Sequence, residues 1–370
     1  MGINDLPVEL TDQIIRPFCV HCAPTKTEGP NDTEETRISF LASLCLLSRR
    51  LNITATPHLY HHLTGRKWPL LARTLLARKD LTQFPTALHF HDYWNADPSH
   101  SSPALVDYFT THFHDWHETL SATQKETFSW QLHGSPELAD MFAPPFHNLP
   151  LDITASLCPN LQTITATLAS DIPTFRFNAP SSLPHLHTAH FTHHDRRDGG
   201  IDLPSLHPLL HAAPHLTTLT LSYFNGTSPN PSYYSPDDDD PPPPLFPPTT
   251  LTPLQLTHLD LRHSVLDVPS LRAILTSCPR LQTLKCAWGG YSVGEGDFSL
   301  LEAAEVVEGC APESLGLFRM SVADEDVVCS EEWQEEDVPE VERRLAERGV
   351  CFQFSWGNMD GVVWRGGVDG

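Results

Sequence analysis

Residues 202–219 read D-L-P-S-L-H-P-L-L-H-A-A-P-H-L-T-T-L, and residues 267–284 read D-V-P-S-L-R-A-I-L-T-S-C-P-R-L-Q-T-L. Nine of these 18 positions are identical, and the ending returns as C-P-N-L-Q-T-I at residues 158–164. Each long copy predicts a short helix that ends at a proline, because proline cannot continue a helix. An alternating L-x-x-L-x-L pattern follows and predicts a strand with its leucines on one face. Recurrence of such a unit indicates a fold built from repeats.

The strand pattern recurs along most of the chain. Strand centres near residues 164, 189 and 219 are 25 and 30 residues apart, and those near 259 and 284 are 25 apart. Because leucine-rich repeats have a period of about 20–29 residues, the array resembles an irregular leucine-rich-repeat horseshoe. The resemblance implies an α/β fold class, with residues 66–370 as an irregular leucine-rich-repeat-like solenoid. Weaker strands are predicted at Leu88 and Phe90, at residues 186–191, at Leu317, and at residues 351–354.

One gap between strands is too long for this period. The segment from Asn225 to Pro253 contains four aspartates followed directly by four prolines. This composition has too few apolar residues to bury a core. We therefore predict a disordered loop at residues 225–253, projecting from the repeats.

The first 65 residues have a helical pattern instead. The stretch L-P-V-E-L-T-D-Q-I-I at residues 6–15 predicts a helix start, with Asp5 as its cap and a proline in its first turn. Leu10, Ile14 and Phe18 recur at four-residue spacing and predict one apolar stripe. A second helix is predicted over residues 39–51 and a third over residues 57–63. Three short helices bury little by themselves, so a partner or a following domain should complete their core.

Three motifs in this region have the order and the N-terminal position of an F-box of the fungal kind. They are L-P-x-E-L at residues 6–10, L-S-R-R-L at 47–51 and A-x-P-x-L-Y at 55–60. Residues 1–65 therefore resemble the F-box, which implies an all-α three-helix domain that binds the Skp-type adaptor of an SCF ubiquitin ligase. A polar insert from Cys19 to Arg37 departs from the family, in which a short turn is typical. The resemblance assigns adaptor binding to Leu6, Pro7, Leu10, Ile14, Leu44, Leu47 and Leu51.

The repeats are then expected to hold a protein target. In an L-x-x-L-x-L strand, the residues between the leucines face outward on the concave side. The candidate target contacts are Thr165, His190, Thr220, Asp260, Arg262 and Lys285. We interpret the chain as a substrate-recognition adaptor that joins an unknown target to the cullin ligase core, while other subunits perform the transfer chemistry. The alternative is a leucine-rich-repeat scaffold whose N-terminal helices have no ligase role.

Three motifs that suggest other chemistry are incomplete. G-Y-S-V-G at residues 290–294 matches a nucleophile elbow, but that fold needs a later histidine and the last one here is His263. H-F-H-D-W-H at residues 112–117 falls on a predicted amphipathic helix, where its first two histidines point about 200° apart. Cys19 and Cys22 form one C-x-x-C without a second such pair, which is weak evidence for zinc. We therefore expect a non-catalytic protein without a metal or a cofactor.

Charge and composition argue against further classes of function. The formal net charge of −23 argues against nucleic-acid binding, which requires Lys and Arg to neutralise phosphates. We find neither a signal-peptide pattern nor an apolar run of the ~20 residues that span a bilayer. A cytoplasmic or nuclear protein that binds no membrane is expected, with its nine cysteines reduced.

Overall fold

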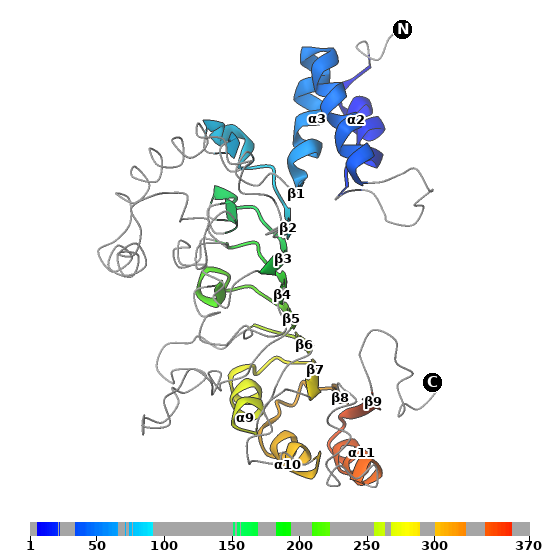
Figure 1. Cartoon of the computed structure of the whole chain (residues 1–370), viewed down its shortest axis with the longest axis vertical. Coiled ribbons are helices and arrows are strands. Elements are labelled where there is room, and N and C mark those ends of the chain that lie inside the picture. The colour runs from blue at the N-terminus through cyan, green and yellow to red at the C-terminus, as the bar shows by residue number, and fades with distance from the viewer. Residues whose placement is uncertain are drawn as a thin grey trace, which may run out of the picture. The chain divides into compact units, whose positions relative to one another are not determined.

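In the computed structural model the chain is a mixed α/β protein that divides into two compact units (Figure 1). The first comprises Met1–Ala166 and Arg176–Leu186, and the second comprises Thr167–Phe175 and His187–Gly370. No helix in the described part of the chain has both the length and the hydropathy that a membrane crossing requires. The structure describes residues 6–20, 22, 34–65, 71, 74–75, 77–91, 151, 154–155, 157–168, 183–193, 209–222, 255–262, 268–288, 300–322 and 337–356.

Three helices lie at the start of the first unit. Helix α1 spans Val8–Ile15 and continues into the 3-10 turn η2, Arg16–Phe18, while α2 spans Glu34–Leu47 and α3 spans Arg49–His61. The prediction of one helix over 39–51 is wrong at its end, because the chain breaks at Ser48. The Ser48 hydroxyl accepts a hydrogen bond from the Leu51 N–H at 3.2 Å and so caps α3. The predicted cap of the first helix, Asp5, lies outside the described residues, and Pro7 occupies the N-cap of α1.

Polar contacts fix how α1 runs beside α3. The Arg50 guanidinium donates to the Leu6 carbonyl at one end, and His58 is 2.8 Å from the Asp12 carboxylate at the other. The two helices are therefore parallel. Their small core, shared with α2, consists of Ile15, Leu41, Leu51 and Ala55, with Leu44, Cys45 and Leu59 packed against it.

Nine strands are hydrogen-bonded in chain order into one sheet. Strand β1 is a correction, because residues 62–63 were predicted to continue a helix and instead form a strand parallel to β2. The other strands occupy the positions that the alternating pattern predicts. Their bounds are β1 His62–Gly65, β2 Ala87–His91, β3 Thr163–Leu168, β4 Thr188–His193, β5 Thr218–Ser222, β6 His258–Arg262, β7 Thr283–Trp288, β8 Leu317–Val322 and β9 Cys351–Trp356.

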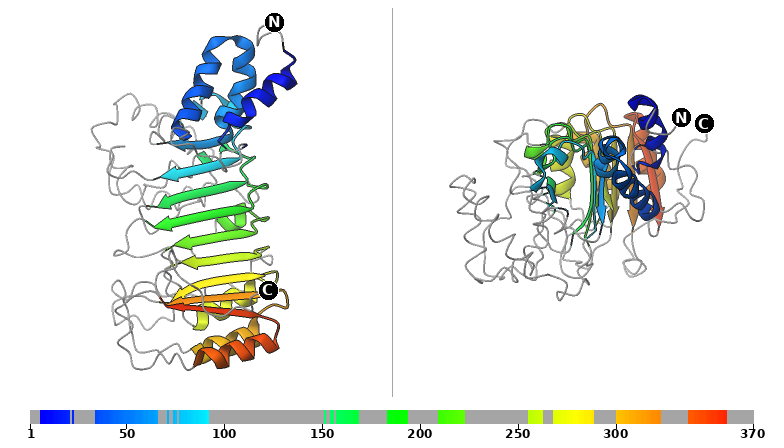
Figure 2. Two further views of the ribbon diagram at one scale, coloured as in Figure 1. Left: turned by 90° about the vertical axis from the view of Figure 1, so that its right-hand side faces the viewer. Right: turned by 90° about the horizontal axis from the view of Figure 1, so that it is seen from above.

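The strands of the second unit pair in parallel with aligned leucines. Leu219 lies opposite Leu259, and Leu259 lies opposite Leu284, so each apolar layer continues from strand to strand. Figure 2 shows β4–β9 side by side, all pointing the same way. The side chains of Leu219 and Leu221 are buried, whereas Thr220 between them is on the opposite face.

Helices cover the leucine side of this unit and return the chain to the start of the next strand. Helix α9 spans Val268–Ser277, α10 spans Leu300–Cys310 and α11 spans Val338–Glu347, and they precede β7, β8 and β9 (Figure 1). The predicted apolar face of α9 is buried, as its Leu271, Ile274 and Leu275 are at most 1% exposed. The predicted loop at 225–253 and the motifs at 112–117 and 290–294 lie outside the described residues.

Candidate functional site

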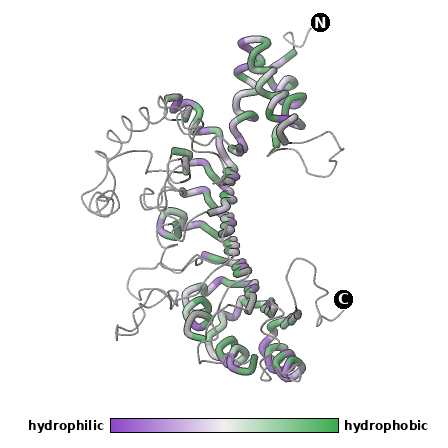
Figure 3. The backbone as a smooth tube through the Cα atoms, in the orientation of Figure 1, coloured by the Kyte–Doolittle hydropathy of each residue, from purple (hydrophilic) through white to green (hydrophobic). Residues whose placement is uncertain are grey.

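The helices of the first unit leave many large hydrophobic side chains in contact with solvent. Leu46, Leu47 and Ile53 are 88%, 71% and 64% exposed. Figure 3 shows hydrophobic stretches along all three helices. Within the described residues, every exposed large hydrophobic side chain belongs to this region: Val8, Leu10, Ile14, Phe18, Phe40, Leu46, Leu47 and Ile53. Exposed large hydrophobic side chains gathered in one part of a protein are typical of interaction surfaces.

Helix α2 is apolar around more of its circumference than its own core uses. Leu41 is 1% exposed and marks the side that faces the core. At about 100° per residue, Leu46 lies about 140° from Leu41 on one side of the helix and Leu47 about 120° on the other. A helix that is hydrophobic all round is normally buried. The second half of α2 therefore has more apolar surface than the described core covers.

The rings of Phe18 and Phe40 join η2 to α2. Their centroids are 4.4 Å apart and the ring planes are tilted by 41°. Ile14 lies one helical turn before Phe18 and is also exposed. These residues extend the apolar surface from α2 onto the predicted stripe of α1.

The structure places the seven predicted adaptor contacts unequally. Leu10, Ile14 and Leu47 are exposed, as is Pro7, whereas Leu6 is half-buried. Leu44 packs against the core. Leu51 is only 3% exposed, so its side chain supports the helices and does not lie on their surface. The predicted adaptor contacts leave out five further exposed side chains, although the sequence places Phe18 on the apolar stripe of α1 and Phe40 on one face with Leu44 and Leu47. These five are Val8, Phe18, Phe40, Leu46 and Ile53, and an apolar count around each helix could have added them.

A second surface is the outward face of the sheet in the second unit. Register brings His190 beside Thr220, Thr220 beside Asp260, and Asp260 beside Lys285. The predicted target contacts on β4–β7 therefore form one row across adjacent strands. Thr165 occupies β3 at a half-buried position, and Arg262 is on β6 with its side chain outside the described residues.

This row continues onto two strands whose outward residues were not predicted. Arg319 lies opposite Lys285, and Gln353 lies opposite Arg319. The Arg319 guanidinium donates to the Gln353 amide oxygen across the two strands. In F-R-M at residues 318–320 and F-Q-F at residues 352–354, a polar residue stands between two apolar ones. This alternation is the signal that could have identified Arg319 and Gln353. We call His190, Thr220, Asp260, Lys285, Arg319 and Gln353 the outward row.

Asp260 corrects the expectation that all residues of this row are exposed. It is 8% exposed, and its Oδ2 lies 3.4 Å from the ammonium of Lys285. Its carboxylate is therefore held by a neighbouring strand. Four other residues of the outward row are half-buried and offer the donors and acceptors of this surface: Thr220, Lys285, Arg319 and Gln353.

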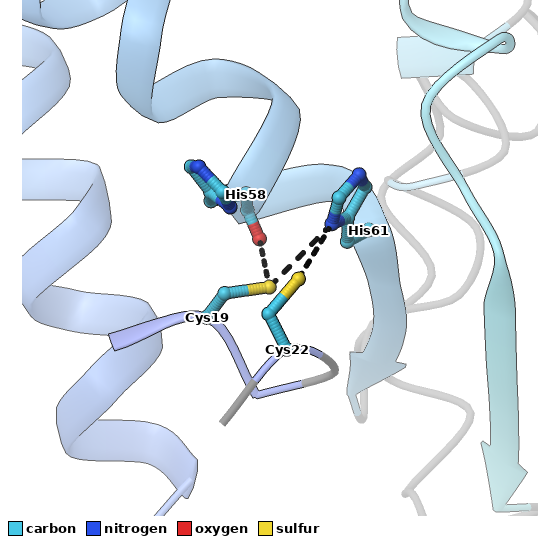
Figure 4. Close-up of side chains that lie close together, drawn as sticks. All are labelled: Cys19, Cys22, His58 and His61. Atoms are coloured by element: carbon cyan, nitrogen blue, oxygen red, sulfur yellow. Dashed lines mark hydrogen bonds between the residues drawn. The ribbon is translucent and has the colours of Figure 1, made fainter. Parts of the chain in front are cut away.

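A cluster of cysteine and histidine lies in the first unit (Figure 4). Cys19 and Cys22 face His58 and His61, and one potential ligand atom from each lies within 4.8 Å of the others. Sequence reasoning found the cysteine pair but missed the histidines, because they follow 36 and 39 residues after Cys22. The signal was the H-L-Y-H of residues 58–61, whose spacing matches that of the cysteines.

The buried cysteines of the strand-forming region have a different character. Burial raises the pKa of the Cys158, Cys278 and Cys286 thiols to about 12. A thiol with so high a pKa remains protonated near neutral pH and is a poor nucleophile. These three cysteines therefore act as small apolar residues of the core.

The chain was also compared with known proteins. No protein-family model matches it, and a search of curated proteins finds no match either.

Proposed function

We propose that this chain is a substrate-recognition adaptor of an SCF-type E3 ubiquitin ligase. Helices α1–α3 would bind a Skp-type adaptor, and the outward row would contact a protein target. The observation that carries the proposal is the confinement of exposed large hydrophobic side chains, within the described residues, to residues 8–53. This region also overlaps two of the three F-box-like motifs, those at residues 6–10 and 47–51.

Such a protein acts by proximity. It performs no bond chemistry itself, but it raises the effective concentration of the target beside the ligase. The polar outward row and the apolar helices have different compositions, which suits two different partners. A target contact on the row would be made mainly by hydrogen bonds and by the charges of Lys285 and Arg319.

Co-purification with a Skp-type adaptor tests the ligase role. We expect the tagged wild-type chain to capture the adaptor, and the Leu10→Ala/Leu47→Ala variant to lose most of that capture. Truncating two anchors in the centre of an interface costs about 1–2 kcal/mol each, so affinity should fall by a factor on the order of 30–1,000.

Leu317→Ala is the matched control. It removes a half-buried leucine from β8 in the second unit, outside the helices that are proposed to bind the adaptor. We expect it to retain most of the capture. Failure of the folded wild-type chain to bind any Skp-type adaptor would refute the ligase role and favour the scaffold alternative.

A further inference from the structure

We propose that Cys19, Cys22, His58 and His61 form a zinc site that ties the segment after α1 to the end of α3. The site is independent of the proposed ligase role. Its four residues come from two places in the sequence and meet because α1 and α3 run in parallel. Two thiolates and two imidazoles are a ligand set that zinc prefers.

The separations between these atoms suit a tetrahedral ion. The Nδ1 of His61 lies 3.6 Å from the Cys19 sulfur and 3.4 Å from the Cys22 sulfur (Figure 4). Zinc with bonds of about 2.3 Å to sulfur and about 2.0 Å to nitrogen holds these atoms about 3.5 Å apart. All four ligand atoms lie within 4.8 Å of one another. A side-chain movement of about 1 Å would therefore bring the fourth ligand atom within bonding distance of the ion.

His58 has the hydrogen-bond environment of a metal ligand. Its Nε2 lies 2.8 Å from Asp12 Oδ1, which leaves Nδ1 as the nitrogen available to an ion. That Nδ1 is buried and has no hydrogen-bond partner among the described residues. Histidines that bind zinc commonly donate their other ring N–H to a carboxylate, which fixes the tautomer and orients the ring. Asp12 is placed for this role.

The local structure directs the cysteine pair and the histidine pair toward the same place. His58 and His61 are three residues apart on the last turn of α3, so they share a face of the helix. Cys19 follows directly after η2, and its side chain is fully buried. Four protein ligands leave no open position for a substrate, which is the arrangement of a structural site. Bound zinc would stabilise a helical unit whose own core is small.

Metal analysis of the full chain, purified without chelators and in the presence of reductant, tests the site. We expect one zinc per chain. After removal by a chelator, Co²⁺ should bind with the visible bands of a tetrahedral complex and the charge-transfer absorption of thiolate ligands. The Cys22→Ser/His61→Gln variant should lose both the stoichiometric zinc and the thiolate absorption.

Two variants serve as matched controls in the same unit. Cys45→Ser removes a half-buried thiol that lies outside the cluster. His62→Gln removes a histidine that follows His61 in sequence, but the ring of His62 stacks on His89 and not on the cluster. Both should retain zinc. Asp12→Asn should bind zinc about 10–100-fold more weakly, as expected for loss of an orienting carboxylate.

The outcomes separate this proposal from its alternatives. Absence of zinc binding by the folded wild-type chain, even after Zn²⁺ is added, would overturn it, as would retention of zinc by the Cys22→Ser/His61→Gln variant. A disulfide between Cys19 and Cys22 in the freshly purified, unreduced protein would indicate a redox pair instead. If the folded wild-type chain binds no zinc but still captures a Skp-type adaptor, the zinc proposal fails and the ligase proposal is retained.

Discussion

At the scale of single residues, one ion pair links the last two described helices. The Arg344 guanidinium donates to both oxygens of Glu308, at 2.8 and 2.5 Å, so the contact between α10 and α11 is bidentate. The hydrogen bonds from Arg344 hold the pKa of Glu308 below its usual range, against the opposing effect of desolvation. Both side chains are partly buried, so solvent screens the pair less than a fully exposed one.

This contact predicts a pH-dependent contribution to stability. A depressed carboxyl pKa stabilises the folded state above the unfolded pKa, and the effect is lost as pH falls through the folded pKa. Glu308→Gln should lower the free energy of unfolding by about 0.5–1 kcal/mol at pH 7. The difference should shrink below the ordinary glutamate pKa of 4.5 and vanish below the depressed one. Denaturant titrations at several pH values would measure it. Glu313→Gln, at an exposed position, should change the free energy of unfolding at pH 7 by less than Glu308→Gln does.

At the scale of elements, local sequence predicted the strands well and the helix boundaries poorly. Strand β7 could be predicted from Leu281, Leu284 and Cys286 because side-chain alternation needs no knowledge of distant residues. The break between α2 and α3 was hidden, because apolar residues continue across Ser48 at helical spacing. At the break the Ser48 hydroxyl accepts a hydrogen bond from the Leu51 N–H and so starts α3 as a separate helix.

Ser48→Ala should therefore weaken the start of α3. Loss of an N-cap hydroxyl costs about 1 kcal/mol, so the first unit should unfold at lower denaturant concentration. Ser48→Asp keeps a side-chain acceptor at the same place and should retain most of the stability. Circular dichroism during denaturation would compare the three proteins. Equal stability of the alanine and aspartate variants would show that packing alone ends α2.

Helix α11 ends in a motif that requires a left-handed residue. Gly349 has φ of 77°, its N–H bonds the Ala346 carbonyl at 2.9 Å, and the Val350 N–H bonds the Leu345 carbonyl at 2.9 Å. These two bonds are those of a Schellman cap, in which a side chain at the left-handed position is strained. Gly349→Ala should destabilise the chain by about 1 kcal/mol.

Gly309 provides the matched substitution in α10. A methyl group there meets nothing within 4 Å, and the residue is helical, so alanine creates no clash. Gly309→Ala should stabilise the chain by about 0.5–1 kcal/mol. Opposite signs for the two glycine variants in thermal denaturation would support the Schellman cap. A stabilising effect at both positions would contradict the left-handed conformation of Gly349.

At the scale of the whole molecule, the strand positions were predictable because their pattern recurs along the sequence, and the cysteine–histidine cluster was not. The endings C-P-N-L-Q-T-I and C-P-R-L-Q-T-L place Cys158 and Cys278 at equivalent positions, and both thiols are buried. The cluster depends on α1 running parallel to α3, which brings Cys19 to His58. No local pattern contains that information, because the Arg50 and Asp12 contacts that set it join residues more than 40 apart.

Cys158 and Cys278 predict how the stability of the two units depends on pH. In the folded chain the pKa of the Cys158 and Cys278 thiols is about 12, against an ordinary cysteine value of 9.0. A raised thiol pKa stabilises the folded state fully below the unfolded pKa, and this contribution is lost as pH rises toward the folded pKa. Stability should therefore fall between pH 9 and about 12, by up to about 1.4 kcal/mol per pH unit for each such thiol.

Alkylation with iodoacetamide at pH 8.5, followed by peptide mass mapping, would follow these thiols individually. The reagent reacts with thiolates, so the exposed Cys351 should be modified in the folded chain, while Cys158 and Cys278 should react only after unfolding. Because Cys158 belongs to the first unit and Cys278 to the second, their modification along a denaturant gradient measures the opening of each unit separately. Rapid modification of Cys158 without denaturant would contradict its burial, whereas delayed modification of both cysteines would support a packed position for each of them in the core of its own unit.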